Sequence, residues 1–131
     1  MKTSSPLEGT RILLVEDSAD TREAFERLLE MEGAEVAVAA DAREAAEIAR
    51  SGDFDVLMTD LGLPDISGDA LISTVLSTAR RRPRVVVVTG YGEPYISRAR
   101  AAGADAVLLK PVVWHRLLAQ LAVPAAQSIA A

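Results

Sequence analysis

The chain has 131 residues, half of them hydrophobic, and contains no cysteine. This length suits one domain with a buried core. The net charge of −5 argues against a nucleic-acid-binding surface, and a sequence without cysteine has no disulfides and no thiolate metal sites. No stretch reaches the ~18 consecutive apolar residues of a membrane span. We therefore expect a cytoplasmic domain that makes no membrane contact of its own.

Strand and helix patterns alternate five times along the chain. The strand patterns are short apolar runs, predicted at about 10–16, 35–39, 56–60, 85–88 and 106–109. The helix patterns place apolar residues at helical spacing, and they are predicted at about 19–32, 42–52, 69–79, 94–102 and 111–121. Such an alternation predicts a fold built from βαβ units.

Helix boundaries carry recognisable signals. Asp41 and Glu44 match a capping box, and Pro94 suits the first position of a helix. We expect Pro111 to start the last helix, which would bury Val113, Leu117, Leu118 and Leu121. The apolar stripe of the first helix is predicted to be Ala24, Phe25, Leu28 and Leu29.

The strand at 56–60 is apolar on both faces, as in the centre of a parallel sheet. Right-handed crossovers would then place helices on both faces of that sheet. The sequence predicts a doubly wound α/β domain with a five-stranded parallel sheet and five helices. The alternative is a small α/β domain with another strand order.

Polar residues follow the strand patterns at the point where each strand ends. Glu16 and Asp17 follow the first strand, and Asp60, Thr89 and Lys110 end or follow the third, fourth and fifth. In an open parallel sheet, ligands bind outside the carboxyl ends of the strands. Three carboxylates, a hydroxyl and an ammonium group would meet there, a set that suits a hard divalent cation and a phosphoryl group.

These residues resemble the receiver domain of two-component response regulators. The resemblance covers about residues 11–121 and is carried by four motifs in order: Leu-Val-Glu16-Asp17, Thr59-Asp60-Leu-Gly-Leu-Pro64 with Gly68, Val-Thr89-Gly90 and Leu-Lys110-Pro111. It implies a flavodoxin-like sheet with strand order 2-1-3-4-5. It divides the chain into a lead-in or linker (1–9), a receiver domain (10–123) and a tail (124–131).

The resemblance also implies the chemistry of the site. Asp60 would take a phosphoryl group from a phosphohistidine of a sensor histidine kinase or phosphotransfer protein. Mg²⁺ would be held directly by Asp17 and Asp60, through water by Glu16, and by the backbone carbonyl of Gly62. Such a domain is a self-phosphorylating and autodephosphorylating phosphoacceptor and, when it stands alone, no enzyme.

Two further side chains complete the implied site. Thr89 would offer its hydroxyl to the phosphoryl group. Lys110 would bring a point charge to the phosphate or to Asp60. In the family, the position of Pro111 is often preceded by a cis peptide bond that would turn Lys110 inward.

The sequence departs from the family pattern at one position. Receivers commonly carry Tyr or Phe where this chain has Val107, so we expect no aromatic switch there. Output would pass through Thr89 and the loop 90–92 to the face of the fourth helix, fifth strand and fifth helix. We expect Tyr91 near the mouth of the site, with Gly62 leaving that side open.

The resemblance implies an unknown downstream protein target, and receivers often self-associate through their last helices and strands. The lead-in and the Thr89-Gly-Tyr-Gly segment resemble receivers attached to hybrid kinases, so the chain is either a stand-alone regulator or part of a larger protein. An alternative function is a pseudo-receiver that binds partners without phosphorylation. Another is a Rossmann-type nucleotide enzyme, although 90–92 gives only part of G-x-G-x-x-G.

Two eye-catching features have ordinary interpretations. The arginine run 80–82 is expected to stabilise the end of the third helix through its dipole, without a nucleic-acid role. His115, the sole histidine, is expected to be an exposed helix residue.

Overall fold

The computed structural model describes residues 5–123; the predicted tail, 124–131, lies outside this part. Strands and helices alternate along it as predicted. The strands are β1 (Arg11–Val15), β2 (Glu35–Ala39), β3 (Val56–Thr59), β4 (Arg84–Thr89) and β5 (Ala106–Leu109). The helices are α1 (Ala19–Met31), α2 (Ala42–Ser51), α3 (Gly68–Thr78), α4 (Tyr95–Ala102) and α5 (Trp114–Leu121). Among the described residues, no helix has the length and apolar character needed to cross a membrane.

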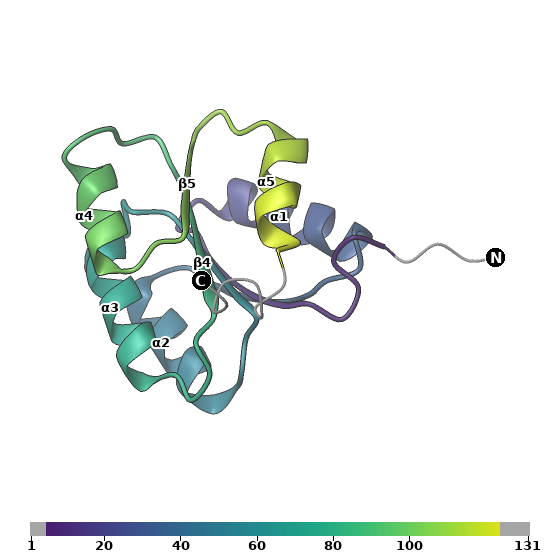
Figure 1. Cartoon of the computed structure of the whole chain (residues 1–131), viewed down its shortest axis with the longest axis horizontal. Coiled ribbons are helices and arrows are strands. Elements are labelled where there is room, and N and C mark those ends of the chain that lie inside the picture. The colour runs from purple at the N-terminus through teal and green to yellow at the C-terminus, as the bar shows by residue number, and fades with distance from the viewer. Residues whose placement is uncertain (1–4, 124–131) are drawn as a thin grey trace.

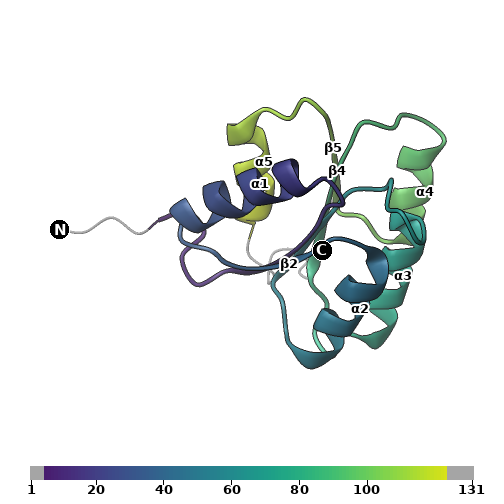
Figure 2. The same cartoon turned by 180° about the vertical axis from the view of Figure 1, so that it is seen from behind.

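The five strands form one parallel sheet in the order β2-β1-β3-β4-β5, which confirms the predicted fold. Helices α1 and α5 cover one face, and α2, α3 and α4 cover the other (Figure 1 and, from behind, Figure 2). Because all strands run in the same direction, their carboxyl ends lie along one edge of the sheet. Any site built from strand ends must therefore form at that edge.

Strand side chains alternate between the two apolar layers. Ile12 and Leu14 of β1 pack in the cluster that includes α1 and α5, while Leu13 and Val15 pack in the cluster that includes α2 and α3. Strand β3 is buried along its whole length, and β4 is buried after its first residue. Burial on both faces holds these central strands, and so the residues at their ends, in fixed positions.

The predicted capping box at α2 forms with one difference: the return bond reaches the residue before the N-cap Asp41. Asp41 caps the helix by accepting the N–H of Glu44 at 2.8 Å, and the Glu44 carboxylate accepts the N–H of Ala40 at 2.8 Å. Asp65, from the loop after β3, accepts the N–H groups of Ala42 at 3.0 Å and Arg43 at 2.8 Å. These bonds, the one from Ala42 first, lower the pKa of Asp65. The loop that follows β3 is thereby tied to α2.

The predicted stripe of α1 is partly wrong. Leu29 is buried and Phe25 is partly buried against the same core, but Ala24 and Leu28 are exposed. Phe25 and Leu29 lie four residues apart, so they form a narrow line along one side of the helix. Only this line faces the sheet, because α1 covers the sheet near its edge.

Helices α4 and α5 begin later than predicted. Pro94 is the N-cap of α4, one residue before the helix. Pro111 lies in the loop before α5, and Val113, expected in the core, is the exposed N-cap of that helix. The chain reaches α5 through a loop at 110–113, in which Val112 packs against the core in place of Val113. The remaining predicted positions do face the core: Leu117, Leu118 and Leu121.

The packed domain begins before its predicted boundary. Leu7, in the segment 1–9 assigned to the lead-in, is fully buried in the apolar cluster that contains Leu29. Its N–H donates to the carbonyl of Glu32 at 2.9 Å, and its carbonyl accepts the N–H of Thr10 at 3.0 Å. An apolar side chain with both backbone groups bonded belongs to the core.

Candidate functional site

The residues predicted from strand ends do meet at the carboxyl edge of the sheet. Glu16 and Asp17 follow β1, Asp60 follows β3, Thr89 ends β4 and Lys110 follows β5. Strands β1, β3, β4 and β5 are neighbours in the sheet in this order. The residues at their carboxyl ends therefore lie close together, although they are far apart in the sequence.

Three carboxylates form the centre of this site. Glu16, Asp17 and Asp60 each offer one oxygen, and these oxygens lie within 4.8 Å of one another. Glu16 is buried, Asp60 half-buried and Asp17 exposed. Like charges at this spacing disfavour one another's ionisation unless a cation lies between them. The cluster therefore has the donor atoms and the charge to hold a hard divalent cation.

Lys110 is the cation that the chain itself supplies. Its Nζ lies 2.9 Å from Asp60 Oδ2 and 3.0 Å from Glu16 Oε1. Burial alone would lower the pKa of Lys110, but its hydrogen bonds to Asp60 and Glu16 and the charges of both carboxylates outweigh burial and raise it. The Lys110–Pro111 peptide bond is cis, as the resemblance implied.

The Asp60 side chain is held from two sides. Its Oδ1 accepts the N–H groups of Leu61 at 2.6 Å and Gly62 at 3.3 Å, and its Oδ2 bonds to Lys110. Beneath it, a β-carbon on Gly68 would lie 2.5 Å from the Asp60 carbonyl oxygen. The start of α3 therefore approaches the Asp60 backbone more closely than a side chain would permit, which explains the glycine in the motif.

Thr89 is fully buried beside the site. Its hydroxyl oxygen accepts the N–H of Tyr91 at 3.1 Å. This bond links the end of β4 to the loop that leads to α4. A hydroxyl that accepts one hydrogen bond can still donate another, so the Thr89 hydroxyl can act as a donor as well.

Tyr91 covers the side of the site that was expected to be open. A β-carbon on Gly62 would lie 2.7 Å from the Tyr91 hydroxyl oxygen, so the tyrosine occupies the space that Gly62 leaves. The Tyr91 ring packs against Tyr95 with centroids 5.1 Å apart. Both rings line a hollow of about 320 Å³ between the loop after β3 and α4. The expectation of an open side was wrong, because a glycine in the sequence does not show which neighbouring side chain occupies the space beside it.

The sequence patterns did not identify Arg22 as a residue near the site. Its Nη1 donates to the carbonyl of Glu16 at 2.9 Å and lies 3.5 Å from the carbonyl of Asp17. It reaches back from the first turns of α1 to the loop that carries both acidic residues. An arginine one turn after the helix cap Ser18 was the available signal.

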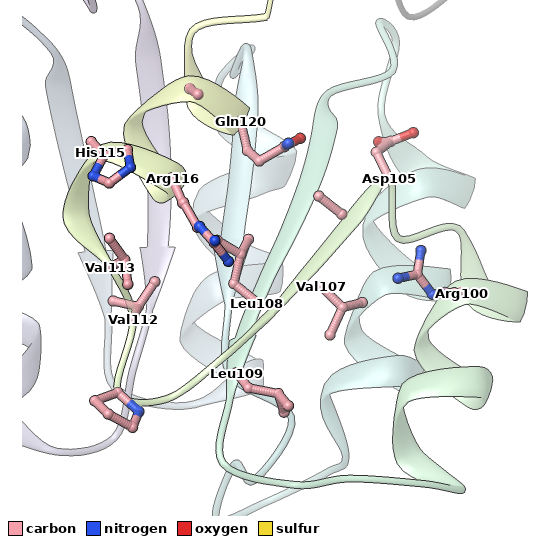
Figure 3. Close-up of a pocket in the computed structure, with 13 residues that line it drawn as sticks. Arg100, Asp105, Val107, Leu108, Leu109, Val112, Val113, His115, Arg116 and Gln120 are labelled. Atoms are coloured by element: carbon pink, nitrogen blue, oxygen red, sulfur yellow. The ribbon is translucent and has the colours of Figure 1, made fainter.

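A second hollow, of about 740 Å³, lies beside the edge strand β5, between α4 and α5 (Figure 3). Val107 lines it at the position where receivers commonly carry an aromatic ring. Leu109 and Val113 are exposed along it, and Arg100 and Arg116 flank it from the two helices. This face is formed by α4, β5 and α5, the elements that follow Thr89 in the chain.

Comparison with known proteins agrees with this geometry. The family model described as "Response regulator receiver domain" matches residues 12–122. A response regulator receiver protein from Anaeromyxobacter sp. (strain Fw109-5) is 33% identical over 108 residues, which is 82% of this chain and 45% of that protein. The chain thus spans about half the length of such curated relatives.

Solved structures share the fold. A response regulator from Burkholderia pseudomallei, with a phosphorylated aspartic acid, calcium ion and citrate, is 29% identical, with a TM-score of 0.80 over 91% of this chain and 70% of that one. The response regulator TrrA from Thermotoga maritima, in complex with Mg(2+)-BeF, is 26% identical, with a TM-score of 0.77 over 86% of this chain and 96% of that one. With the family model matching nearly all of its sheet and helices, this chain belongs to the receiver domains of two-component response regulators.

Proposed function

We propose that Asp60 accepts a phosphoryl group from the phosphohistidine of a sensor histidine kinase or phosphotransfer protein. One observation carries this proposal: the Asp60 carboxylate lies among two further carboxylates and bonds directly to the ammonium group of Lys110. The phosphorylated aspartic acid in the Burkholderia pseudomallei neighbour supports the same chemistry.

The transfer needs one new bond and breaks one. A carboxylate oxygen of Asp60 attacks phosphorus, and the bond between phosphorus and the imidazole nitrogen breaks. The imidazole keeps the electron pair and takes up a proton, and Asp60 becomes an aspartyl phosphate. Phosphoryl transfer depends mainly on alignment and charge neutralisation. The N–H groups of Leu61 and Gly62 orient the carboxylate, and Lys110 supplies positive charge.

The carboxylate cluster fits Mg²⁺. Its oxygen donors are the kind that this hard cation prefers, and one lysine does not balance three carboxylates. We assign Asp17 and Asp60 as direct ligands, Glu16 as a ligand through water, and the Gly62 carbonyl as the remaining protein donor. When bound, Mg²⁺ would supply positive charge to these carboxylates and to the phosphoryl oxygens. The Mg(2+)-BeF complex of the Thermotoga maritima neighbour supports this assignment.

Thr89 connects the site to the rest of the domain. Its hydroxyl can donate to a phosphoryl oxygen on Asp60 while it still accepts the N–H of Tyr91. When Thr89 shifts toward the phosphoryl group, the loop 90–92 follows, and α4 with it. Val107 offers no aromatic ring to carry this change. A downstream protein would then contact the altered face formed by α4, β5 and α5, where the larger hollow lies.

The remaining assignments follow from this role. Residues 10–123 form the receiver unit, with Leu7 packed onto it. The chain acts in the cytoplasm, where kinases of this system present their phosphohistidine. It turns over no separate substrate: it takes up its own phosphoryl group and loses it by hydrolysis. The net charge of −5 suits protein partners better than nucleic acid.

Acetyl phosphate tests the proposal without a cognate kinase. With Mg²⁺ present, the intact mass should increase by one phosphoryl group, and Asp60→Asn should abolish the increase. Asp53→Asn, which removes a carboxylate far from the site, is the matched control and should label normally. If the wild type gained no mass while another receiver labelled under the same conditions, a phosphorylation-independent pseudo-receiver would replace this proposal.

A further inference from the structure

Arg22 joins the first turns of α1 to the loop that carries Glu16 and Asp17. Its Nη1 lies 2.9 Å from the Glu16 carbonyl oxygen and 3.5 Å from that of Asp17. We propose that Arg22 is a positioning residue that sets the geometry of the cation site by holding the backbone of both acidic residues. This inference rests on the proposed function, because it concerns the same site.

The Glu16 carbonyl lies just beyond the sheet's hydrogen-bond ladder. The last bonds of β1 at this edge run from the N–H of Asp60 to the Val15 carbonyl at 3.2 Å, and from the N–H of Glu16 to the Ala39 carbonyl at 3.0 Å. Glu16 is only 3% exposed, so its carbonyl has little access to water. A buried carbonyl beyond the ladder needs a donor, and the Arg22 guanidinium supplies a charged one.

The backbone bond from Arg22 complements the bonds to the Glu16 side chain. Glu16 Oε2 accepts the N–H of Ser18 at 3.1 Å, and Oε1 bonds to Lys110 at 3.0 Å. With the main chain fixed by Arg22 and the carboxylate fixed by these two, Glu16 has one orientation. Without Arg22 the loop can turn, and the oxygens that now lie within 4.8 Å of one another would spread.

Arginine suits this position better than lysine. One nitrogen, Nη1, faces the carbonyls of both Glu16 and Asp17, and the rigid planar guanidinium fixes its direction, whereas a lysine ammonium lies on a flexible four-carbon stem. Arg27 offers a comparison on the same helix. Its guanidinium pairs with the exposed carboxylate of Glu23 at 3.3 Å, and its side chain is 76% exposed. It has the same charge as Arg22 but, among the described residues, no bond to the loop that carries Glu16 and Asp17.

Titration calorimetry of the unphosphorylated full chain with MgCl₂ tests this role. Because loss of an outer partner typically weakens metal binding about 10- to 100-fold, Arg22→Met should raise the Kd for Mg²⁺ at least about 10-fold. Arg22→Lys, which keeps the charge, should fall between Arg22→Met and the wild type. Arg27→Met should bind as the wild type does.

Melting curves without Mg²⁺ separate positioning from simple stabilisation. A variant of Arg22 that melts earlier but binds Mg²⁺ with wild-type affinity would overturn the inference and leave the proposed function intact. If Arg22→Met did not fold, the affinity of Arg22→Lys would decide, and a wild-type value there would also overturn it. A wild-type chain that bound no Mg²⁺ would overturn both this inference and the metal site of the proposed function.

Discussion

Both edges of the sheet hold clusters of charged side chains, but the charges of the two clusters balance differently. At the amino edge, three arginines pair with three aspartates: Arg80–Asp53 at 3.3 Å, Arg81–Asp55 at 2.8 Å and Arg82–Asp105 at 2.9 Å. At the carboxyl edge, three carboxylates lie together, and Lys110 pairs with two of them, Glu16 and Asp60. The first cluster is neutral, and the second carries excess negative charge.

The amino-edge aspartates also bind the starts of strands. Asp55 accepts the N–H of Arg11 at 2.8 Å, and Asp105 accepts the N–H of Val85 at 2.7 Å. The arginine run therefore pairs with aspartates, two of which bind the starts of strands, and the expectation that it stabilises the end of α3 was wrong about its contacts. Charge that is balanced within the fold serves structure, whereas the excess negative charge at the carboxyl edge of the sheet favours a bound cation.

Replacing Lys110, which pairs with the carboxylates of Glu16 and Asp60, should have the largest effect on stability. Lys110→Met would leave Glu16, whose side chain is 5% exposed, without its cation. Breaking a buried pair typically costs about 3–5 kcal/mol, and the 32% exposure of the Lys110 side chain places the expected loss at about 2–3 kcal/mol. Urea unfolding without Mg²⁺ measures it.

The amino edge provides the control. Arg81→Met removes one partner of an exposed pair, for which about 0–1 kcal/mol is typical. Added Mg²⁺ should narrow the difference in stability between Lys110→Met and the wild type, and leave the difference between Arg81→Met and the wild type unchanged. Equal losses in the two variants would contradict the distinction between the edges.

Removing one carboxylate from each edge should change the affinity for Mg²⁺ at the carboxyl edge alone. Asp17→Asn deletes one of the two proposed direct ligands, so its Kd for Mg²⁺ should rise by at least the roughly 10–100-fold that loss of an outer partner costs. Asp53→Asn removes the same charge from the amino edge and should leave the Kd unchanged. Calorimetry gives both values. A similar weakening in Asp53→Asn would mean that long-range charge, not the local cluster, determines binding.

The stabilisation by Lys110 should also depend on pH in a defined direction. Its pKa is raised in the folded chain above the ordinary value of 10.5, because the bonds to Asp60 and Glu16 outweigh burial. Its contribution is therefore complete below the unfolded pKa and is lost as pH rises through the folded one. The stability difference between the wild type and Lys110→Met should stay constant from about pH 7 to 9 and shrink above about pH 10.5. A difference that already declined between pH 7 and 9 would contradict the raised pKa.

Much of this arrangement could be predicted because strand ends are visible in sequence. A polar residue after a buried run marks the edge of a parallel sheet, which brought Glu16, Asp17, Asp60 and Lys110 together correctly. The strand order came from the resemblance, since hydrophobic periodicity does not say which strands are neighbours.

The missed features depend on side-chain reach. Arg22 is an ordinary residue in the pattern of α1, and only the fold shows that its guanidinium returns to the preceding loop. The place of Tyr91 over Gly62 likewise depends on how the loop after β4 turns. The late start of α5 at Trp114 was missed because proline suits both a first helical turn and a loop.

Gly62→Ala should produce the smallest effect. The added methyl would meet the hydroxyl end of Tyr91, a side chain that is 48% exposed and can turn outward, so the loss of stability should stay within about 1 kcal/mol. The ring should leave Tyr95, which NMR of the tyrosine rings would detect. In a Tyr91→Ala background, Gly62→Ala should cost nothing, because the two groups no longer meet. An equal loss of stability in both backgrounds would show that the methyl group disturbs the loop after Asp60 itself. Contact with Tyr91 would then not be the reason that position 62 disfavours a side chain.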